Sequence, residues 1–224
     1  MLKMFRLKQV ISTILLVCCL CANGFAAGFQ DLTASPLEEA VTAASEIGIL
    51  SGYDGNFRPD DLITREEIAK IITLAQGGEA IYDALPFDDV SAERWGYGYI
   101  GYCNQHGIMQ GVSDTEFQPD APVTREAFVK MLMDAMGYAV MVGIETTPAA
   151  YYSAAVTHLP SLTVRAIPKR TANLTRGEAA ELLYTALHLP MLVADDSNGL
   201  FIDYVISDGS NGTALVTLYT KYFQ

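Results

Sequence analysis

An internal repeat constrains the fold of this chain more than any other feature. The matching segments are FQDL (29–32) and FDDV (87–90), GILSG (48–52) and GIMQG (107–111), and FRPDDLITRE (57–66) and FQPDAPVTRE (117–126). A third, degenerate copy keeps LTRGE at 174–178 but lacks the glycine-rich step. A repeat of this length predicts units that stack on one another, because no unit can bury its apolar face alone.

The repeat divides the chain into three units and a tail. We place unit 1 at residues 28–80, unit 2 at 81–140, the degenerate unit 3 at 141–190 and the tail at 191–224.

Each unit contains a threonine that predicts the start of a helix. These threonines are Thr64, Thr124 and Thr175. A threonine hydroxyl at this place accepts a hydrogen bond from a free backbone N–H of the first helical turn. Glu67 and Glu178 stand three residues later and complete a capping box, whereas unit 2 has Ala127 there, so that Thr124 caps alone.

The predicted helices carry matching apolar stripes at helical spacing, which predict the core. The stripes are Ile68, Ile71, Ile72 and Ala75; Phe128, Met131, Leu132 and Ala135; and Ala179, Leu182, Leu183 and Ala186. An earlier helix is expected in each unit, at residues 36–47, 93–106 and, more weakly, 148–158. Between the helices, Phe57 and Phe117 are expected to point inward. The predicted fold is mainly α, with tandem helix-loop-helix units.

Residues 1–27 are typical of a secretory signal peptide. Lys3, Arg6 and Lys8 precede an apolar run at residues 10–22, which is short for a membrane span. A retained membrane anchor is the alternative. Three of the four cysteines lie in this segment, so the secreted chain would keep Cys103 alone and could form no internal disulfide.

The charge of the chain is strongly acidic. Formal net charge is −12, and removing the three basic residues of the signal leaves 11 basic against 26 acidic side chains, or −15. This balance argues against nucleic acid as a partner. One basic island interrupts it, formed by Arg165, Lys169 and Arg170 with the nearby Arg176. The island either faces an anionic polymer or is a solvated loop.

The order of these motifs resembles the S-layer homology (SLH) repeat. The matching pattern is Phe-x-Asp-Val, Trp, Gly-Ile-x-x-Gly, Phe-x-Pro-Asp and Thr-Arg-Glu, and it is nearly complete over residues 87–137, including Trp95. The resemblance implies a secreted, non-catalytic module of a bacterial cell wall or S-layer. It also implies a pseudo-threefold arrangement whose inter-repeat grooves hold a secondary cell-wall polysaccharide, often carrying a pyruvyl ketal.

The resemblance also implies the residues that contact the glycan. By position they are Arg65, Arg125, Arg176, Asp31, Asp89, Trp95, Gly52 and Gly111. Chemistry supports the arginines independently, because a helix N-terminus and a planar guanidinium both suit a carboxylate. The alternative is that each arginine pairs with an aspartate of the loops.

Other sites are weaker. Acid pairs at 60–61 and 88–89 could suggest glycoside hydrolysis, but such pairs are common in acidic proteins. His106, His158 and His188 have no metal-ligand spacing. We therefore predict no enzyme activity, no metal and no cofactor.

The tail changes character. Residues 200–207 and 213–223 are rich in β-forming residues around a turn at 208–212, which predicts a hairpin. The tail could begin a further domain or dock on a protein partner. The predicted function is non-covalent anchoring to cell-wall glycan; the alternative is an assembly protein whose tail recruits a partner and whose glycan binding is reduced or lost.

Overall fold

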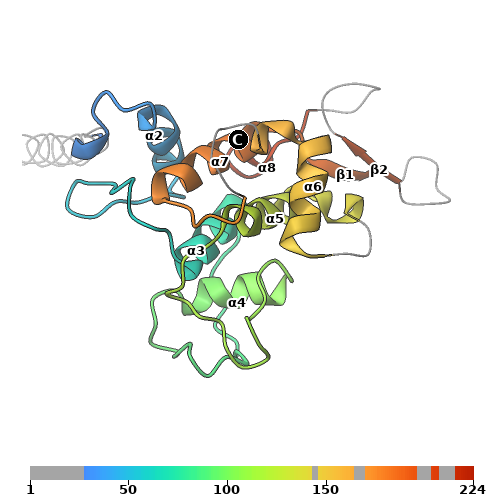
Figure 1. Cartoon of the computed structure of the whole chain (residues 1–224), viewed down its shortest axis with the longest axis horizontal. Coiled ribbons are helices and arrows are strands. Elements are labelled where there is room, and N and C mark those ends of the chain that lie inside the picture. The colour runs from blue at the N-terminus through green and yellow to red at the C-terminus, as the bar shows by residue number, and fades with distance from the viewer. Residues whose placement is uncertain (1–27, 143–145, 164–169, 196–202, 207–214) are drawn as a thin grey trace, which may run out of the picture.

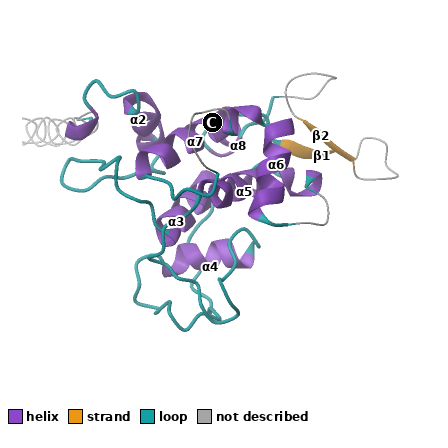
Figure 2. Ribbon diagram, viewed as in Figure 1, coloured by secondary structure: helices purple, strands orange, loops and turns teal. Residues whose placement is uncertain are grey.

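The computed structural model describes residues 28–142, 146–163, 170–195, 203–206 and 215–224. Helices dominate this part of the chain, as predicted (Figure 2). The α-helices are α2 (Glu38–Glu46), α3 (Arg65–Ala75), α4 (Tyr97–Gln105), α5 (Arg125–Ala135), α6 (Pro148–His158), α7 (Arg176–His188) and α8 (Leu218–Tyr222). The strands are β1 (Leu192–Asp195) and β2 (Asp203–Ile206), and short 3-10 turns are η1 (Gln30–Leu32), η2 (Tyr138–Met141) and η3 (Pro160–Leu162).

The capped helices α3, α5 and α7 meet at a closed ring of backbone hydrogen bonds. Ile63 N–H donates to the carbonyl of Leu174 at 3.1 Å, Leu174 N–H to that of Val123 at 2.8 Å, and Val123 N–H to that of Ile63 at 3.2 Å. One residue from each unit therefore donates once and accepts once. Unit 3 takes part in the ring as fully as the other two, although its sequence is degenerate.

Each prong of the molecule combines helices from two different units. Helix α4 packs on α3, α6 on α5, and α2 on α7, and the three prongs point away from the centre (Figure 1). A first helix therefore packs on the capped helix of the neighbouring unit. This exchange ties the units together and explains why a single unit has too little core of its own.

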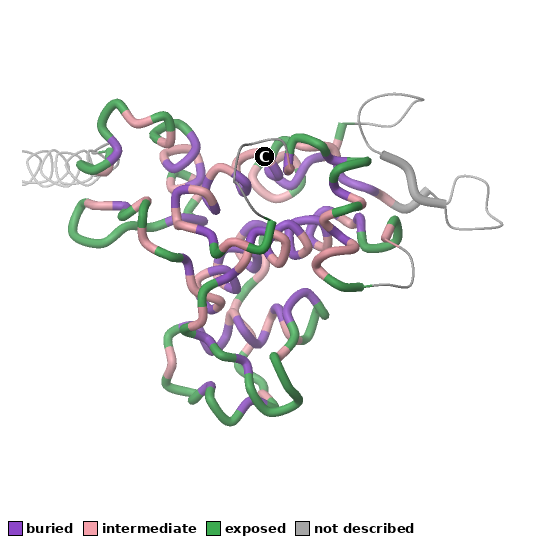
Figure 3. The backbone as a smooth tube through the Cα atoms, in the orientation of Figure 1, coloured by how far each residue is buried: buried purple, intermediate pink, exposed green. Residues whose placement is uncertain are grey.

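The core lies where the capped helices converge (Figure 3). Every residue of the three predicted stripes is buried, and so are Phe57 and Phe117. Phe57 packs against Phe29 with ring centroids 5.5 Å apart, and Phe117 packs against Phe87 at 5.3 Å. The expected caps are also confirmed: Thr64 and Thr175 form capping boxes, whereas Thr124 caps without one.

Helix α4 begins four residues later than expected from the sequence. Its N-cap is Gly96, and a Cβ at that position would lie 2.6 Å from Oε2 of Glu66. The segment before it makes turns that bring Arg94 to the same carboxylate. The helix thus starts only after the segment of the chain that contacts the buried Glu66.

The tail folds differently from the predicted hairpin. β2 pairs antiparallel with β1, which precedes it, and the predicted second strand contains α8 instead. Thr217 caps α8 together with Thr220, and Leu218 is completely buried. The predicted turn at 208–212 lies outside the described residues.

The C-terminal helix docks on the helical body. Helix α8 packs against α7 and α3. Met191 N–H donates to the carbonyl of Val216 at 2.8 Å, and Leu192 N–H to that of Met136 at 3.0 Å. Within the described segments, no helix is both long and apolar enough to cross a membrane.

Candidate anion-binding grooves between the repeats

The first groove forms where Arg176 of unit 3 reaches the loop of unit 1. Its guanidinium lies 4.8 Å from the ring centroid of Phe57. Nε donates to the carbonyl of Phe57 at 3.0 Å, Nη2 to that of Ser51 at 2.9 Å, and Nη1 to Oε1 of Glu67 at 2.5 Å. The groove has a volume of about 520 Å³, within the range of small-molecule sites.

The same contacts recur one unit along, at an interface that we call the second groove. Arg65 of unit 1 lies over Phe117 of unit 2, 4.4 Å from the ring centroid. Its Nε donates to the carbonyl of Phe117 at 2.7 Å, and Nη2 donates to that of Gln110 at 2.8 Å. Burial lowers the pKa of the Arg65 guanidinium, although the charge of Asp89 opposes this effect. The side chain remains a cation at neutral pH.

Arg125 differs from the other two predicted arginines. Its side chain is only 1% exposed. A side chain so enclosed presents no face to a ligand in solution. The buried position of Arg125, the arginine of unit 2, therefore gives no support to its predicted contact with a glycan.

The N-termini of the capped helices do not offer the free N–H groups that we expected for an anion. Arg65 N–H donates to the carbonyl of Ala121, and Glu66 N–H to that of Pro119. The corresponding groups of α5 and α7 donate in the same way to carbonyls of the next unit. The third N–H of each helix bonds to the capping threonine. Recognition of an anion must therefore depend on side chains.

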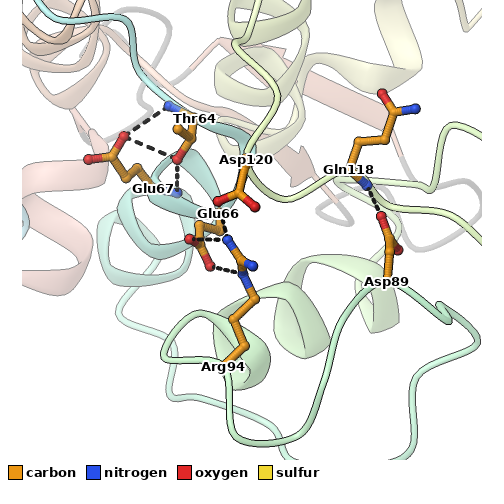
Figure 4. Close-up of polar contacts among 7 residues, drawn as sticks. All are labelled: Thr64, Glu66, Glu67, Asp89, Arg94, Gln118 and Asp120. Atoms are coloured by element: carbon orange, nitrogen blue, oxygen red, sulfur yellow. Dashed lines mark hydrogen bonds and ion pairs between the residues drawn. The ribbon is translucent and has the colours of Figure 1, made fainter.

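The predicted aspartates fasten the loops. Asp31 accepts hydrogen bonds from the N–H groups of Phe57 at 2.9 Å and Arg58 at 2.6 Å. Asp89 does the same with Phe117 at 2.8 Å and Gln118 at 2.6 Å; the latter bond is drawn in Figure 4. Desolvation raises the pKa of each carboxyl, but these backbone hydrogen bonds outweigh it, so each pKa lies below its ordinary value.

The predicted glycines and tryptophan have distinct surroundings. A Cβ on Gly52 would lie 2.3 Å from the carbonyl oxygen of Asn56, and one on Gly111 would lie 2.3 Å from that of Ser113. Both glycines therefore permit close packing of the loop. Trp95 is 54% exposed and lines the first groove. Because Trp95 belongs to unit 2, all three units contribute to that groove.

Sequence reasoning missed a buried ion pair behind the first groove. Arg94 donates to both carboxylate oxygens of Glu66, at 2.6 and 2.7 Å, and also contacts Asp120 (Figure 4). Glu66 is only 4% exposed, so the paired arginine offsets the cost of burying its charge. The only feature of the sequence that could have pointed to this ion pair is the position of Arg94 next to Trp95.

Sequence reasoning also did not identify Lys70 as a residue of the first groove. It lies on α3, lines the first groove, and has its Nζ 3.3 Å from the hydroxyl oxygen of Ser51. Its signal in the sequence is weak, because a lysine on a helix face is usually solvated.

The predicted basic island is only partly described. Arg165 and Lys169 lie outside the described residues. Arg170 is exposed and pairs with Glu126 at 3.4 Å, so its charge is directed to a carboxylate of this chain. Among the residues with assigned positions, no three His, Cys, Asp or Glu side chains gather as a metal site would require.

The capped helices meet in a ring, and an arginine of one unit lies over the loop of the next. These features define a module made of repeats, with its grooves at the interfaces between units. Residues 28–69 and 86–129 match the S-layer homology domain. These two segments of the chain are thus S-layer homology domains, which indicate a location at the bacterial cell surface.

Three relatives with similar sequences have names that refer to a surface layer, a cell wall or anchoring. The surface-layer 125 kDa protein of Lysinibacillus sphaericus is 41% identical over 99 residues, covering 44% of this chain and 8% of the relative. The middle cell wall protein of Brevibacillus brevis is 25% identical over 200 residues, covering 83% and 18%. The cellulosome-anchoring protein of Acetivibrio thermocellus is 30% identical over 84 residues, covering 35% and 19%. The matches span less than a fifth of each relative.

Proposed function

We propose that this chain anchors to the cell wall by binding an acidic secondary polysaccharide, such as one carrying a pyruvyl ketal, without covalent attachment. The observation that carries the proposal is the pair of grooves at which Arg65 and Arg176 lie over a loop phenylalanine. Carbonyl groups of the loop fix both guanidinium groups. A groove whose walls are held in place in this way loses little conformational freedom when a ligand binds.

The walls of the first groove suit a sugar. Trp95 and Tyr53 are 54% and 71% exposed and line the same groove. Aromatic rings of this kind offer an apolar face to a sugar ring and a polar edge to its hydroxyls. Glycan recognition would combine these faces with the cationic side chains of the groove.

The proposed role is non-catalytic. Asp89 and Asp61, one from each acid pair noted in the sequence, are engaged as a loop clamp and as a partner of Arg58. We also propose that residues 1–27 are a cleaved signal peptide and that the units have the bounds given above. The alternative assembly function receives less support, because α8 docks on the body instead of projecting toward a partner.

Sedimentation with purified cell walls tests the proposal. We expect the chain to bind walls that retain the secondary polymer and to lose binding after acid extraction of that polymer. Arg65→Gln should weaken binding, whereas Arg170→Gln, an exposed arginine paired with Glu126, serves as the matched control. Binding that survives extraction, or binding equal in both variants, contradicts the proposal.

A further inference from the structure

The first groove contains three cations and three carboxylates, but one of the cations has no carboxylate partner in the part of the chain that the structure describes. Its ion pairs are Arg176 with Glu67, Arg58 with Asp61, and Glu66 with Arg94, which also contacts Asp120. Lys70 is an additional cation on the same wall. Its ammonium contacts the hydroxyl of Ser51, and within the described residues it makes no ion pair.

In unit 2 the equivalent lysine has a carboxylate partner. Lys130 stands where Lys70 stands in unit 1, but it pairs with Asp134 at 2.7 Å. Helix α3 has Leu74 at the position of that aspartate. The lysine of unit 2 is therefore neutralised, while the lysine of unit 1 is not.

For the arginines, the one in the first groove has a carboxylate partner and the one in the second groove has none among the described residues. Arg176 is paired with Glu67, which also caps α3 through its other oxygen, 2.9 Å from the N–H of Thr64. The equivalent residue in unit 2 is Ala127. Arg65 accordingly makes no ion pair in the described part of the chain, and its hydrogen bonds go to carbonyl oxygens.

We propose that Lys70, and not Arg176, receives the carboxylate of the acidic glycan in the first groove, while Arg65 does so in the second. This inference rests on the proposed function. Arg176 is already neutralised by Glu67 and its side chain is only 16% exposed, so a ligand carboxylate would gain little by pairing with it. To pair with Lys70, it has only to replace one hydrogen bond to a serine hydroxyl. Arg176 is then a positioning residue that joins unit 3 to the loop of unit 1.

The test isolates the first groove by using Arg65→Gln as the background. The probes are a monosaccharide carrying a pyruvyl ketal and the same sugar without it, titrated calorimetrically. Adding Lys70→Gln should weaken binding of the ketal sugar about tenfold, the worth of one charge-assisted hydrogen bond, and leave the neutral sugar unaffected. Lys70→Arg should retain the preference for the ketal. Lys130→Gln is the matched control and should change neither affinity.

Release of Arg176 provides a second arm. Glu67→Gln keeps a side-chain oxygen for the cap but removes the charge that neutralises Arg176. Combined with Lys70→Gln, it should restore binding of the ketal sugar. If Lys70→Gln leaves the affinity unchanged while Arg176→Gln abolishes it, the role of Lys70 is overturned and the proposed function stands. If the unmodified chain binds neither the ketal sugar nor cell walls, both are overturned.

Discussion

Two residues with left-handed backbone conformation show why each loop needs its aspartate. Arg58 has φ 62° and Gln118 has φ 59° at equivalent places, and side chains other than glycine adopt this region at a cost. The N–H of each bonds to the aspartate one motif upstream. The carboxylate therefore holds the strained residue and the buried phenylalanine in one arrangement.

The lowered pKa values of Asp31 and Asp89 predict a loss of stability in acid. A carboxyl whose pKa is lower in the folded state stabilises the fold above its unfolded pKa of about 3.9, and this stabilisation is lost as the pH falls through the folded value. Urea denaturation between pH 2 and 6 should show the free energy of unfolding falling below about pH 4. The double variant Asp31→Asn/Asp89→Asn should be less stable at pH 6 and show a shallower fall. An equally steep fall in that variant would contradict this role.

Ala127→Glu should separate stability from binding. The new carboxylate would complete a capping box with Thr124, which favours the helix by about 0.5–1 kcal/mol. It would also face the guanidinium of Arg65, as Glu67 faces Arg176. We expect unchanged or higher thermal stability together with weaker binding of an acidic glycan at the second groove. Ala127→Gln is the neutral control and should retain binding; equal affinities for both variants would oppose the expectation.

At the scale of the element, the three helix caps should contribute unequally to the stability of the fold. Replacing Thr64 or Thr175 with alanine removes a capping box, whereas replacing Thr124 removes a single hydrogen bond. We expect a loss of about 1–2 kcal/mol in unfolding free energy for the first two and a smaller loss for the third. Chemical denaturation of the three variants measures the difference, and three identical losses would show that the boxes add nothing.

Docking of α8 is a second prediction at this scale. Leu218 is completely buried, while Leu215, just before the helix, is 55% exposed. Leu218→Ala should lower the free energy of unfolding by about 2–5 kcal/mol. Leu215→Ala should change it by less than about 0.5 kcal/mol. If both substitutions prove neutral, α8 contributes little to the fold in solution.

Local patterns predicted much of the helical structure. The capping threonines, the apolar stripes and helix α6 could be read from the sequence because their causes lie within a few neighbouring residues. The start of α4 could not, because it depends on Glu66 from another unit. The anion site expected at the helix starts failed for the same reason: carbonyls such as those of Ala121 and Pro119 come from the next unit.

In the tail, strand β2 falls within the first predicted strand, but the second predicted strand was wrong because strand propensity is weak beside tertiary context. A β-rich segment at 213–223 contains a helix, since Thr217 caps it and Leu218 enters the core. The grooves themselves were predicted through family resemblance. Their charge balance was not, because the partners of Lys70 and Arg65 depend on which units meet.

At the scale of the whole molecule, the ring makes folding depend on all three units. A chain lacking residues 146–224 loses Leu174, which gives the ring one donor and one acceptor. We expect this truncated chain to lose cooperative thermal unfolding and near-ultraviolet circular dichroism. A sharp transition at the midpoint of the complete chain would mean that units 1 and 2 fold independently.

The first groove joins parts of the chain that are far apart, since Arg176 and Ser51 are separated by 125 residues. If a wall polymer binds there as proposed, it would sit beside the joint between unit 3 and unit 1. That joint contains the ring bond from Ile63 to Leu174 and the guanidinium contacts of Arg176. The contacts that close the fold are thus the ones next to the bound polymer, so separating unit 3 from unit 1 would also take the first groove apart.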